Sequence, residues 1–357
     1  MTSFQREFLT SYGWDDFFES QCPAVLKNNL VIGRVINEER NLYRIQTDKE
    51  HFIQAKISGK MQYEAISRVD YPAVGDWVLC DPSGVIHFIF ERKNILQRKK
   101  VGEVSEIQIL ASNVDYVFIA TSVSSDLNYG RLERYLTFAW ESKAEPVILL
   151  TKADLEEDID NVILGVESRC PNVWVHALAK DHFEEASFLR RYLGSGKTSV
   201  IVGSSGVGKS TLVNFLIGKE IIATQEVRSD DDKGRHTTTS RAMYESVYGG
   251  LIIDTPGMRE LQFSDHQEGL SHQFGDIEEL IGQCRFNNCH HQSEVGCAVL
   301  KALDEGELLP ERWKSYQKIQ REVGHEMRKT NKWLMAEQRK VWKKRSIESR
   351  QKYKGWQ

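Results

Sequence analysis

The sequence predicts a multidomain α/β protein in three parts: an N-terminal β-barrel, a phosphate-binding domain built on a parallel sheet, and a C-terminal helical, metal-binding part. Three observations support this prediction. Short β-type runs crowd residues 29–105, strands and helices alternate over 106–275, and cysteines and histidines gather within 276–357. A chain of 357 residues is long enough for two or three domains of ordinary size.

Residues 1–28 form an N-terminal extension with aromatic side chains among polar ones. The sequence leaves two interpretations open, a short docking helix or a loose arm. The aromatic residues are Phe4, Phe8, Trp14, Phe17 and Phe18.

Residues 29–105 carry five short runs of β-forming residues, separated by Asn, Asp, Gly and Pro. Five strands of this length suit a small barrel, for which the OB-fold is the leading candidate. OB-folds often bind nucleic acid, and Arg92, Lys93, Arg98, Lys99 and Lys100 follow the last run. RNA binding and a merely solvated charged edge both stay open for these residues. The five runs are Leu30–Ile36, Tyr43–Thr47, Phe52–Ile57, Asp76–Cys80 and Val85–Phe90.

An alternation of strands and helices begins near residue 106. Tyr116–Thr121 and Pro146–Leu150 have the apolar composition of buried strands. Between them, Leu132, Tyr135, Leu136 and Ala139 fall on one helical face. We therefore expect a mostly parallel sheet with helices on both sides.

A phosphate-binding loop follows the apolar run at 199–202. The residues from Gly203 to Ser210 match G-x-x-x-x-G-K-[ST]. Such a loop wraps a polyphosphate in backbone N–H groups, sends its lysine to the β and γ phosphates, and gives its serine hydroxyl to Mg²⁺. The alternative is a Gly/Ser-rich turn between a strand and a helix. The expected nucleotide contacts are Gly203, Ser204, Ser205, Gly206, Val207, Gly208, Lys209, Ser210 and Thr211.

The segment Thr151-Lys152-Ala153-Asp154 is similar to the guanine-recognition motif [NT]-K-x-D. The Asp154 carboxylate could accept hydrogen bonds from N1–H and the N2 amino group of guanine, a donor pair that adenine lacks. Lys152 would lay its aliphatic stem along the base. Thr151 stands where an Asn is usual and lacks that amide. Beside a phosphate loop, the motif predicts binding of GTP and GDP.

Two further segments have the composition of nucleotide switches. In Asp254-Thr-Pro-Gly257, Asp254 would hold Mg²⁺ through water, and the Gly257 N–H would face the γ-phosphate. Lys233–Thr239 reads Lys-Gly-Arg-His-Thr-Thr-Thr, in which Thr238 is the best candidate to complete the metal's coordination. The expected Mg²⁺ ligands are therefore Ser210, Thr238 and Asp254.

The order of the motifs differs from that of ordinary GTPases. The guanine motif and a degenerate base-loop candidate, His176-Ala-Leu178, precede the phosphate loop instead of following the switches. The chain therefore has the pattern of a circularly permuted GTPase. Permutation brings Asp254–Gly257 near the C-terminal end of the domain, so that whatever follows is joined to that switch.

The position after Gly257, which often holds a water-orienting Gln, is Met258. A thioether cannot orient an attacking water, so we expect slow intrinsic hydrolysis. His236 is the best local substitute, since an imidazole could position the water or accept its proton. The alternative for His236 is a solvent-exposed loop histidine.

Three thiols and an imidazole lie close together in Cys284-x4-Cys289-x-His291-x5-Cys297. This Cys₃His set is typical of a closed structural Zn²⁺ site, without an open position for a catalytic water. Unlinked cysteines beside a surface histidine are the alternative, and spacing does not exclude His290 as the ligand.

Charge is distributed unevenly along the chain. Its net charge is −4, yet residues 310–357 carry fifteen Lys and Arg against five Glu. Tyr316, Ile319, Val323, Met327 and Leu334 recur at helical spacing in this tail. A basic helix with interleaved tryptophans suits RNA, and a solvated face is the alternative.

Composition also bears on compartment. No stretch approaches the ~18 apolar residues of a membrane span, and the first residues lack a secretory pattern. Three of the six cysteines belong to the compact set, which favours a metal site in a reducing cytosol over a disulfide framework. We expect a cytoplasmic monomer without membrane contact.

The ordered motif set resembles the ribosome small-subunit-dependent GTPase A family. The resemblance covers roughly residues 30–310 and rests on the barrel, T-K-x-D, the phosphate loop, G-R-H-T-T-T, D-T-P-G and the Cys₃His set. It implies a bacterial, cytoplasmic assembly or maturation factor that binds the 30S subunit, hydrolyses GTP in response and then leaves. It also implies a catalytic role for His236.

The resulting hypothesis is a 30S-activated GTPase whose barrel, zinc site and tail hold rRNA. Two alternatives stay open at this point. One is an RNA-binding scaffold whose nucleotide site is a slow latch, and the other is a permuted GTPase that acts on the large subunit.

Overall fold

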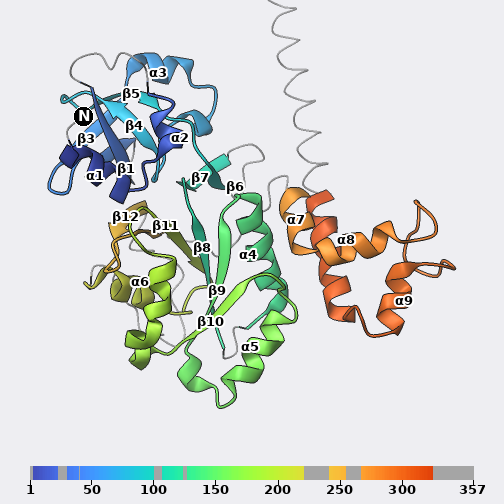
Figure 1. Ribbon diagram of the computed structural model, residues 1–357. Coiled ribbons are helices and arrows are strands. Elements are labelled where there is room, and N and C mark those ends of the chain that lie inside the picture. The colour runs from blue at the N-terminus through green and yellow to red at the C-terminus, as the bar shows by residue number, and fades with distance from the viewer. Residues whose placement is uncertain are drawn as a thin grey trace, which may run out of the picture.

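The computed structural model describes residues 3–22, 30–39, 41–99, 107–123, 127–220, 241–254 and 267–324. Its N-terminal part is a closed five-stranded barrel, which confirms the OB-like prediction (Figure 1). The strands pair in the order β1-β2-β3-β5-β4, and β4 returns to β1. Alternating side chains such as Val35, Tyr43 and Ile45 fill the interior. The strands are β1 (Val31–Glu39), β2 (Leu42–Gln46), β3 (Phe52–Ile57), β4 (Trp77–Cys80) and β5 (Val85–Ile89).

The N-terminal extension is docked, which settles the choice that the sequence left open. It forms α1 (Ser3–Ser11) and α2 (Asp16–Glu19). Trp14 is 5% exposed and lies edge-on to Trp77 and Phe90 of the barrel, with 5.0 Å between ring centroids in each pair. The extension therefore shares a hydrophobic core with the barrel.

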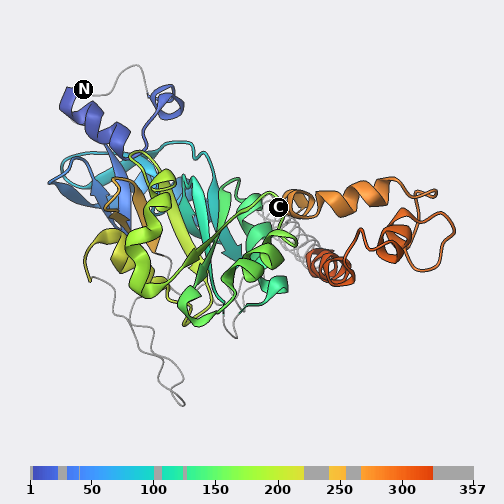
Figure 2. The ribbon, with the colours of Figure 1, turned by 60° about the horizontal axis from the view of Figure 1, so that its bottom comes forward.

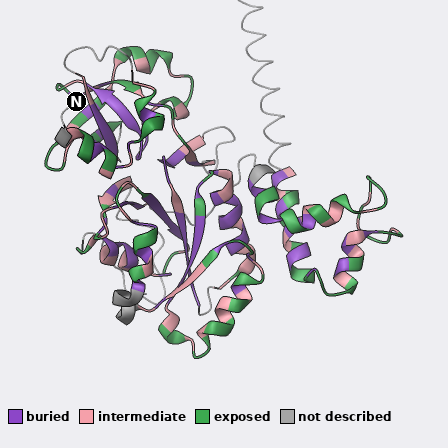
Figure 3. Cartoon of the chain, in the orientation of Figure 1, coloured by how far each residue is buried: buried purple, intermediate pink, exposed green. Residues whose placement is uncertain are grey.

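The next domain is built on parallel strands, as expected. In the order β10-β9-β8-β11-β13 all neighbours run parallel, and β12 joins β13 antiparallel. The central strands are buried (Figure 3). The strands are β8 (Tyr116–Ser122), β9 (Glu145–Thr151), β10 (Trp174–Leu178), β11 (Thr198–Gly203), β12 (Arg241–Glu245) and β13 (Leu251–Asp254).

Helices cover this sheet. The face formed by Leu132, Tyr135, Leu136 and Ala139 is buried, as the helical spacing predicted. The helices are α4 (Tyr129–Glu141), α5 (Ile159–Glu167) and α6 (Lys209–Ile217), with the 3-10 segments η2 (Ala153–Leu155) and η3 (Lys180–Arg191).

A hairpin of β6 (Ile95–Lys99) and β7 (Ile107–Ser112) connects barrel and sheet, and the expected boundary at 105/106 falls between its strands. A second connection was not foreseen. The first half of β1 pairs with β4 to close the barrel, while Asn37 and Glu38 pair with Ala242 and Arg241 of β12. One continuous sheet of eleven strands therefore runs through both domains.

The C-terminal part is helical and stands beside α4, to one side of the sheet (Figure 2). It has its own hydrophobic core, which includes Phe274, Trp313 and Tyr316. Its helices are α7 (Gln267–Gln273), α8 (Gly275–Gly282), α9 (Ala298–Asp304) and residues 310–324. Tyr316, Ile319 and Val323 of the expected tail helix face this core, whereas Met327 and Leu334 lie outside the described residues.

Candidate nucleotide site and metal cluster

The phosphate loop lies at the carboxyl end of β11, between β8 and β13. Gly203 has φ +146°, and a Cβ there would lie 2.2 Å from the Ala120 carbonyl oxygen of β8. Gly206 and Gly208 have φ of +79° and +91°, in the left-handed region, with open space around them. Glycine at these positions therefore permits the loop's close turn and leads into α6 at Lys209. In open α/β sheets this edge is the usual ligand site.

Lys209 reaches back across the loop. Its ammonium donates to the Gly203 carbonyl at 2.9 Å and to the Ser204 carbonyl. Asp254 ends β13, with its Cα opposite that of Ile201 in the sheet register. Burial raises the pKa of the Asp254 carboxyl, and the positive charge of Lys209 opposes that shift. Lys209 and Asp254 thus act on one another electrostatically, as residues of one site.

The guanine motif follows directly from β9. Thr151 ends the strand and is 5% exposed; its hydroxyl lies 2.6 Å from the Val207 carbonyl oxygen and 3.2 Å from that of Thr121. A hydroxyl has one proton, so the shorter contact identifies Val207 as the acceptor. The threonine therefore supplies a contact to the phosphate loop even without the amide of an Asn. Sequence reasoning missed this contact, because it joins residues far apart in the chain.

The two remaining motif residues stand at the end of the same strand. Lys152 has φ +56°, a left-handed conformation that few non-glycine residues adopt, and it turns the chain into η2. Asp154 lies in η2 with an exposed side chain. The carboxylate is therefore accessible from solvent, three residues after the Thr151 contact to the phosphate loop.

Other expected site residues lie elsewhere. His236, Thr238, Gly257 and Met258 fall outside the described residues, and their roles stay predictions. In the base-loop candidate, the His176 ring stacks on Phe188 at 4.2 Å between centroids, and its Nε2 lies 3.0 Å from the Tyr192 hydroxyl. His176 thus takes part in packing in the middle of β10.

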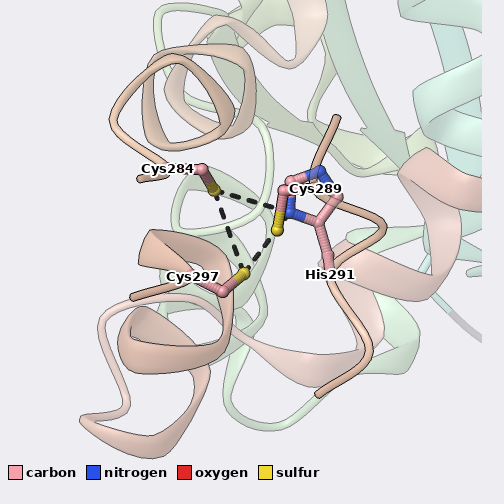
Figure 4. Close-up of side chains that lie close together, drawn as sticks. All are labelled: Cys284, Cys289, His291 and Cys297. Carbon is pink, nitrogen blue, oxygen red and sulfur yellow. Dashed lines mark hydrogen bonds between the residues drawn. The ribbon is translucent and has the colours of Figure 1, made fainter. Parts of the chain in front are cut away.

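The Cys₃His residues form a compact cluster that could hold a metal ion (Figure 4). The His291 Nδ1 lies 3.4 Å from the Cys297 Sγ and 3.6 Å from the Cys284 Sγ, and these sulfurs are 3.9 Å apart. A tetrahedral Zn²⁺ with bonds of about 2.3 Å to S and 2.0–2.1 Å to N places its ligand atoms ~3.6–3.8 Å apart. The cluster fits such an ion, and it includes His291, not His290.

A residue that sequence reasoning overlooked shapes the cluster's loop. Glu294 accepts backbone hydrogen bonds from His290, Gln292 and Ser293 at 2.8–3.0 Å. These bonds lower the pKa of its carboxyl to about 2. The signal was an acidic residue between two ligands in a tight turn. Glu294 therefore fixes the loop that carries His291, which itself has φ +57°.

No helix among the described residues is long and apolar enough to cross a membrane.

Comparison with known proteins supplies the family. The model of the RsgA GTPase family matches residues 89–264, and a model described as 50S ribosome-binding GTPase matches 198–332. The chain is 43% identical over 326 residues to small ribosomal subunit biogenesis GTPase RsgA 1 of Oceanobacillus iheyensis, covering 90% of this chain and 93% of that protein. It is 40% identical to RsgA 2 of Vibrio vulnificus, covering 95% and 93%.

Two solved structures are similar at TM-score 0.61 and 26% identity. The crystal structure of YjeQ from Thermotoga maritima covers 82% of this chain and 98% of its own, and that of YloQ, described as a circularly permuted GTPase, covers 85% and 98%. The chain therefore belongs to the RsgA GTPase family and is a GTP hydrolase with a circularly permuted GTPase domain.

Proposed function

We propose that this protein acts in the late assembly of the small ribosomal subunit: it binds the 30S particle, hydrolyses GTP there and then dissociates. One observation carries the proposal. The Thr151 hydroxyl joins the guanine motif to the phosphate loop at 2.6 Å, in a chain whose relatives are named for small-subunit biogenesis. Guanine selection and phosphate binding thereby belong to one rigid site. The cytoplasm is the compartment that this role requires.

The described residues account for nucleotide binding. Asp154 accepts from N1–H and the N2 amino group of guanine, and Lys152 covers the base. The backbone N–H groups from Gly203 to Thr211 surround the phosphates. Lys209 exchanges the carbonyls of Gly203 and Ser204 for the β and γ phosphates.

The switch residues are assigned from their motifs. Ser210, Thr238 and Asp254 would hold Mg²⁺, and the half-buried Asp254 carboxylate, on which the charge of Lys209 acts, suits that role. Bound Mg²⁺ neutralises charge on the β and γ phosphates. The Gly257 N–H would face the γ-phosphate, and His236 would position the attacking water or accept its proton, which Met258 cannot do.

We assign Zn²⁺ to the cluster of Cys284, Cys289, His291 and Cys297. The donor set and its spacings support a closed, structural ion. The barrel, the zinc loop and the basic tail are the surfaces proposed to hold rRNA, and the protein is proposed to act as a monomer.

Single-turnover GTP hydrolysis with and without purified 30S subunits tests the proposal. We expect strong stimulation by 30S, and its loss in a His236→Ala variant with nucleotide affinity retained. Cosedimentation should show tighter association with 30S in a non-hydrolysable GTP analogue than in GDP. Absence of stimulation, with the His236→Ala variant fully functional, favours the scaffold with a slow nucleotide latch.

A second candidate, action on the large subunit, follows from the description of the model that matches residues 198–332. The curated relatives are named for biogenesis of the small subunit and support the first candidate instead. The same sedimentation with separated subunits discriminates the two. Association with 50S instead of 30S would support the second candidate.

A further inference from the structure

Two of the basic residues after the last barrel strand, Arg92 and Lys93, are paired within the protein, and Lys100 lies outside the described residues. Arg92 makes a two-pronged ion pair with Asp76 at 2.7 and 2.8 Å, and the two side chains are 10% and 0% exposed. Lys93 pairs with Asp15 of the N-terminal extension. For Arg92 and Lys93 the structure therefore favours an internal role, and the barrel must present other cations to a nucleic acid.

Another part of the barrel presents them. A cavity of about 720 Å³ opens between the β1–β2 turn, the edge of β2 and β3, and the segment that joins α3 (Gly59–Glu64) to η1 (Arg68–Asp70). Among the described residues, its lining includes two cations, Lys56 and Arg68, and no carboxylate. Arg68 also donates to the Asn41 side-chain oxygen at 3.1 Å. Leu42, Ile66 and Tyr71 supply apolar and aromatic surface. In OB-folds, strands 2–3 and the loop between strands 1 and 2 commonly receive oligonucleotides.

The wall of this cavity is fixed by buried and local contacts. Asp70 accepts from the backbone N–H of Ile66 and of Ser67, at 2.9 and 2.8 Å, in a capping box. Arg92 donates to the carbonyls of Val69 and Tyr71, each at 2.7 Å. Ile66 is nevertheless 97% exposed, an unusual position for a large apolar side chain on so well held a turn. The turn therefore holds Ile66 and Arg68 out toward solvent in a preorganised geometry.

The chemistry of the cavity fits one class of ligand. Two cations without a carboxylate attract a phosphate, and an exposed aliphatic side chain beside an aromatic ring accepts the face of a base. The Arg68 guanidinium already lies 5.4 Å from the Tyr71 ring centroid, which shows that this ring accepts a planar group. The volume lies within the ~300–1,000 Å³ of small-ligand pockets.

We propose that this cavity receives one unstacked nucleotide of single-stranded RNA, with its phosphate on Lys56 and Arg68 and its base against Ile66 and Tyr71. The inference rests on the proposed function, because it locates on the barrel a contact to the RNA of the assembling subunit. A neighbouring hollow lined by Lys60, Glu64 and Glu91 has mixed charge and provides the internal comparison.

The test measures binding of a short single-stranded RNA to the full chain by fluorescence anisotropy over a salt series. Lys56→Gln and Arg68→Gln should each weaken binding and lower the salt slope by about one. Ile66→Ser should weaken binding by about fivefold or more with the slope unchanged. Lys60→Gln is the matched control: Lys60 lies on α3 with its side chain 81% exposed and lines the other hollow, so this variant should bind RNA like the parent protein.

Equal affinities and salt slopes for Lys56→Gln and Lys60→Gln would overturn the proposal, as would equally strong binding of the same RNA as a duplex. The same variants assayed for 30S-stimulated hydrolysis separate this inference from the proposed function. If 30S subunits fail to stimulate GTP hydrolysis by the parent protein, that result refutes the proposed function and not the cavity. Stimulation in the parent, with RNA binding unaffected in all three cavity variants, refutes the cavity alone.

Discussion

The GTPase domain is joined to its two neighbours in opposite ways. On the barrel side, backbone pairing of β1 with β12 continues the sheet, and a single hydrophobic core spans the N-terminal extension, the barrel and the parallel strands. On the C-terminal side the helices keep a core of their own, and polar side chains make hydrogen bonds across the junction.

Two buried arginines illustrate the difference. Arg34 is 1% exposed and donates to the carbonyls of Tyr12, Gly75 and Asn113 and to the Thr198 hydroxyl, which belong to four segments from the turn after α1 to β11. Arg312 is paired with Asp276 of its own domain at 2.7 Å and reaches across to the Arg169 carbonyl. The barrel is thus built into the GTPase domain, whereas the C-terminal domain is docked against it. A docked domain that follows directly on a nucleotide switch is the part best placed to respond to hydrolysis.

The largest expected effect distinguishes the docked C-terminal domain from the fused barrel. His291→Ala should abolish metal binding and unfold the C-terminal domain, since a structural Zn²⁺ contributes on the order of 10 kcal/mol to folding. The barrel and GTPase domain should keep their own thermal transition. Calorimetry with a zinc assay checks this, with His290→Ala as the control. A common shift of all transitions would show that the C-terminal domain is not an independent unit.

Arg34→Met should destabilise the fused part by roughly 3–5 kcal/mol, because four buried acceptors each lose a hydrogen bond. Of these acceptors, the Gly75 carbonyl keeps a second hydrogen bond, from the Asn113 side chain. Urea unfolding followed by tryptophan fluorescence measures the change. Arg44→Met is the control, since Arg44 lies exposed over the Phe52 ring. Similar midpoints for the two variants would mean that Arg34 does not hold these segments together.

Gly269→Ala should loosen the docked domain by about 2 kcal/mol. A Cβ at Gly269 would lie 2.2 Å from the Thr137 carbonyl oxygen of α4, so α7 could not pack as closely. Hydrogen exchange should accelerate in α4 and α7 while β1 and β12 stay protected. Gly275→Ala, with open space around it, should be neutral or slightly stabilising. Unchanged hydrogen exchange in Gly269→Ala would show that the contact between α7 and α4 accommodates the added methyl group.

The smallest effect is a pH dependence at the docked junction. Glu133 is 2% exposed; burial raises the pKa of its carboxyl above the usual 4.5, against the lowering influence of Ser315 and Arg312. The folded protein therefore keeps a proton that the unfolded chain has lost, so stability falls as pH rises through the interval just above 4.5.

Glu133→Gln should remove this slope in urea unfolding curves recorded across that interval. Asp276, Arg169 and Arg312 face the same carboxyl and remain in the variant. An unchanged slope would assign the dependence to another group.

Local patterns predicted much of this molecule. Alternation in the barrel runs, the glycines of the phosphate loop and the spacing of the Cys₃His set each reflect a requirement within a few residues. The nucleotide motifs converged for the same reason, because parallel strands bring their carboxyl ends to one edge.

Contacts between distant segments could not be predicted in that way. The hydroxyl of Thr151 and the carbonyl of Val207 meet only after β9 and β11 have taken their places in the sheet. From the sequence alone, the aromatic residues of the N-terminal extension fit both a docking helix and a loose arm. In the structure, Trp77 and Phe90 of the barrel supply the surface on which the extension docks. In the sequence the charge of Arg92 suits RNA binding, but in the structure Arg92 is paired with the buried Asp76.

The pairing of β1 with β12 also has a consequence during synthesis, because β12 is made long after β1. Glu38 and its partner Arg241 are 203 residues apart, which a ribosome translating ~5–20 residues per second covers in about 10–40 seconds. During that time the outer end of β1 is an open sheet edge, on which a foreign strand could pair. Glu38 and Glu39 stand at that end, and charged residues on an edge strand oppose such pairing. Once β12 has been synthesised, Arg241 forms an ion pair with Glu38 at 3.4 Å. The carboxylate that opposes foreign pairing in the nascent chain therefore becomes part of the β1–β12 contact in the folded protein.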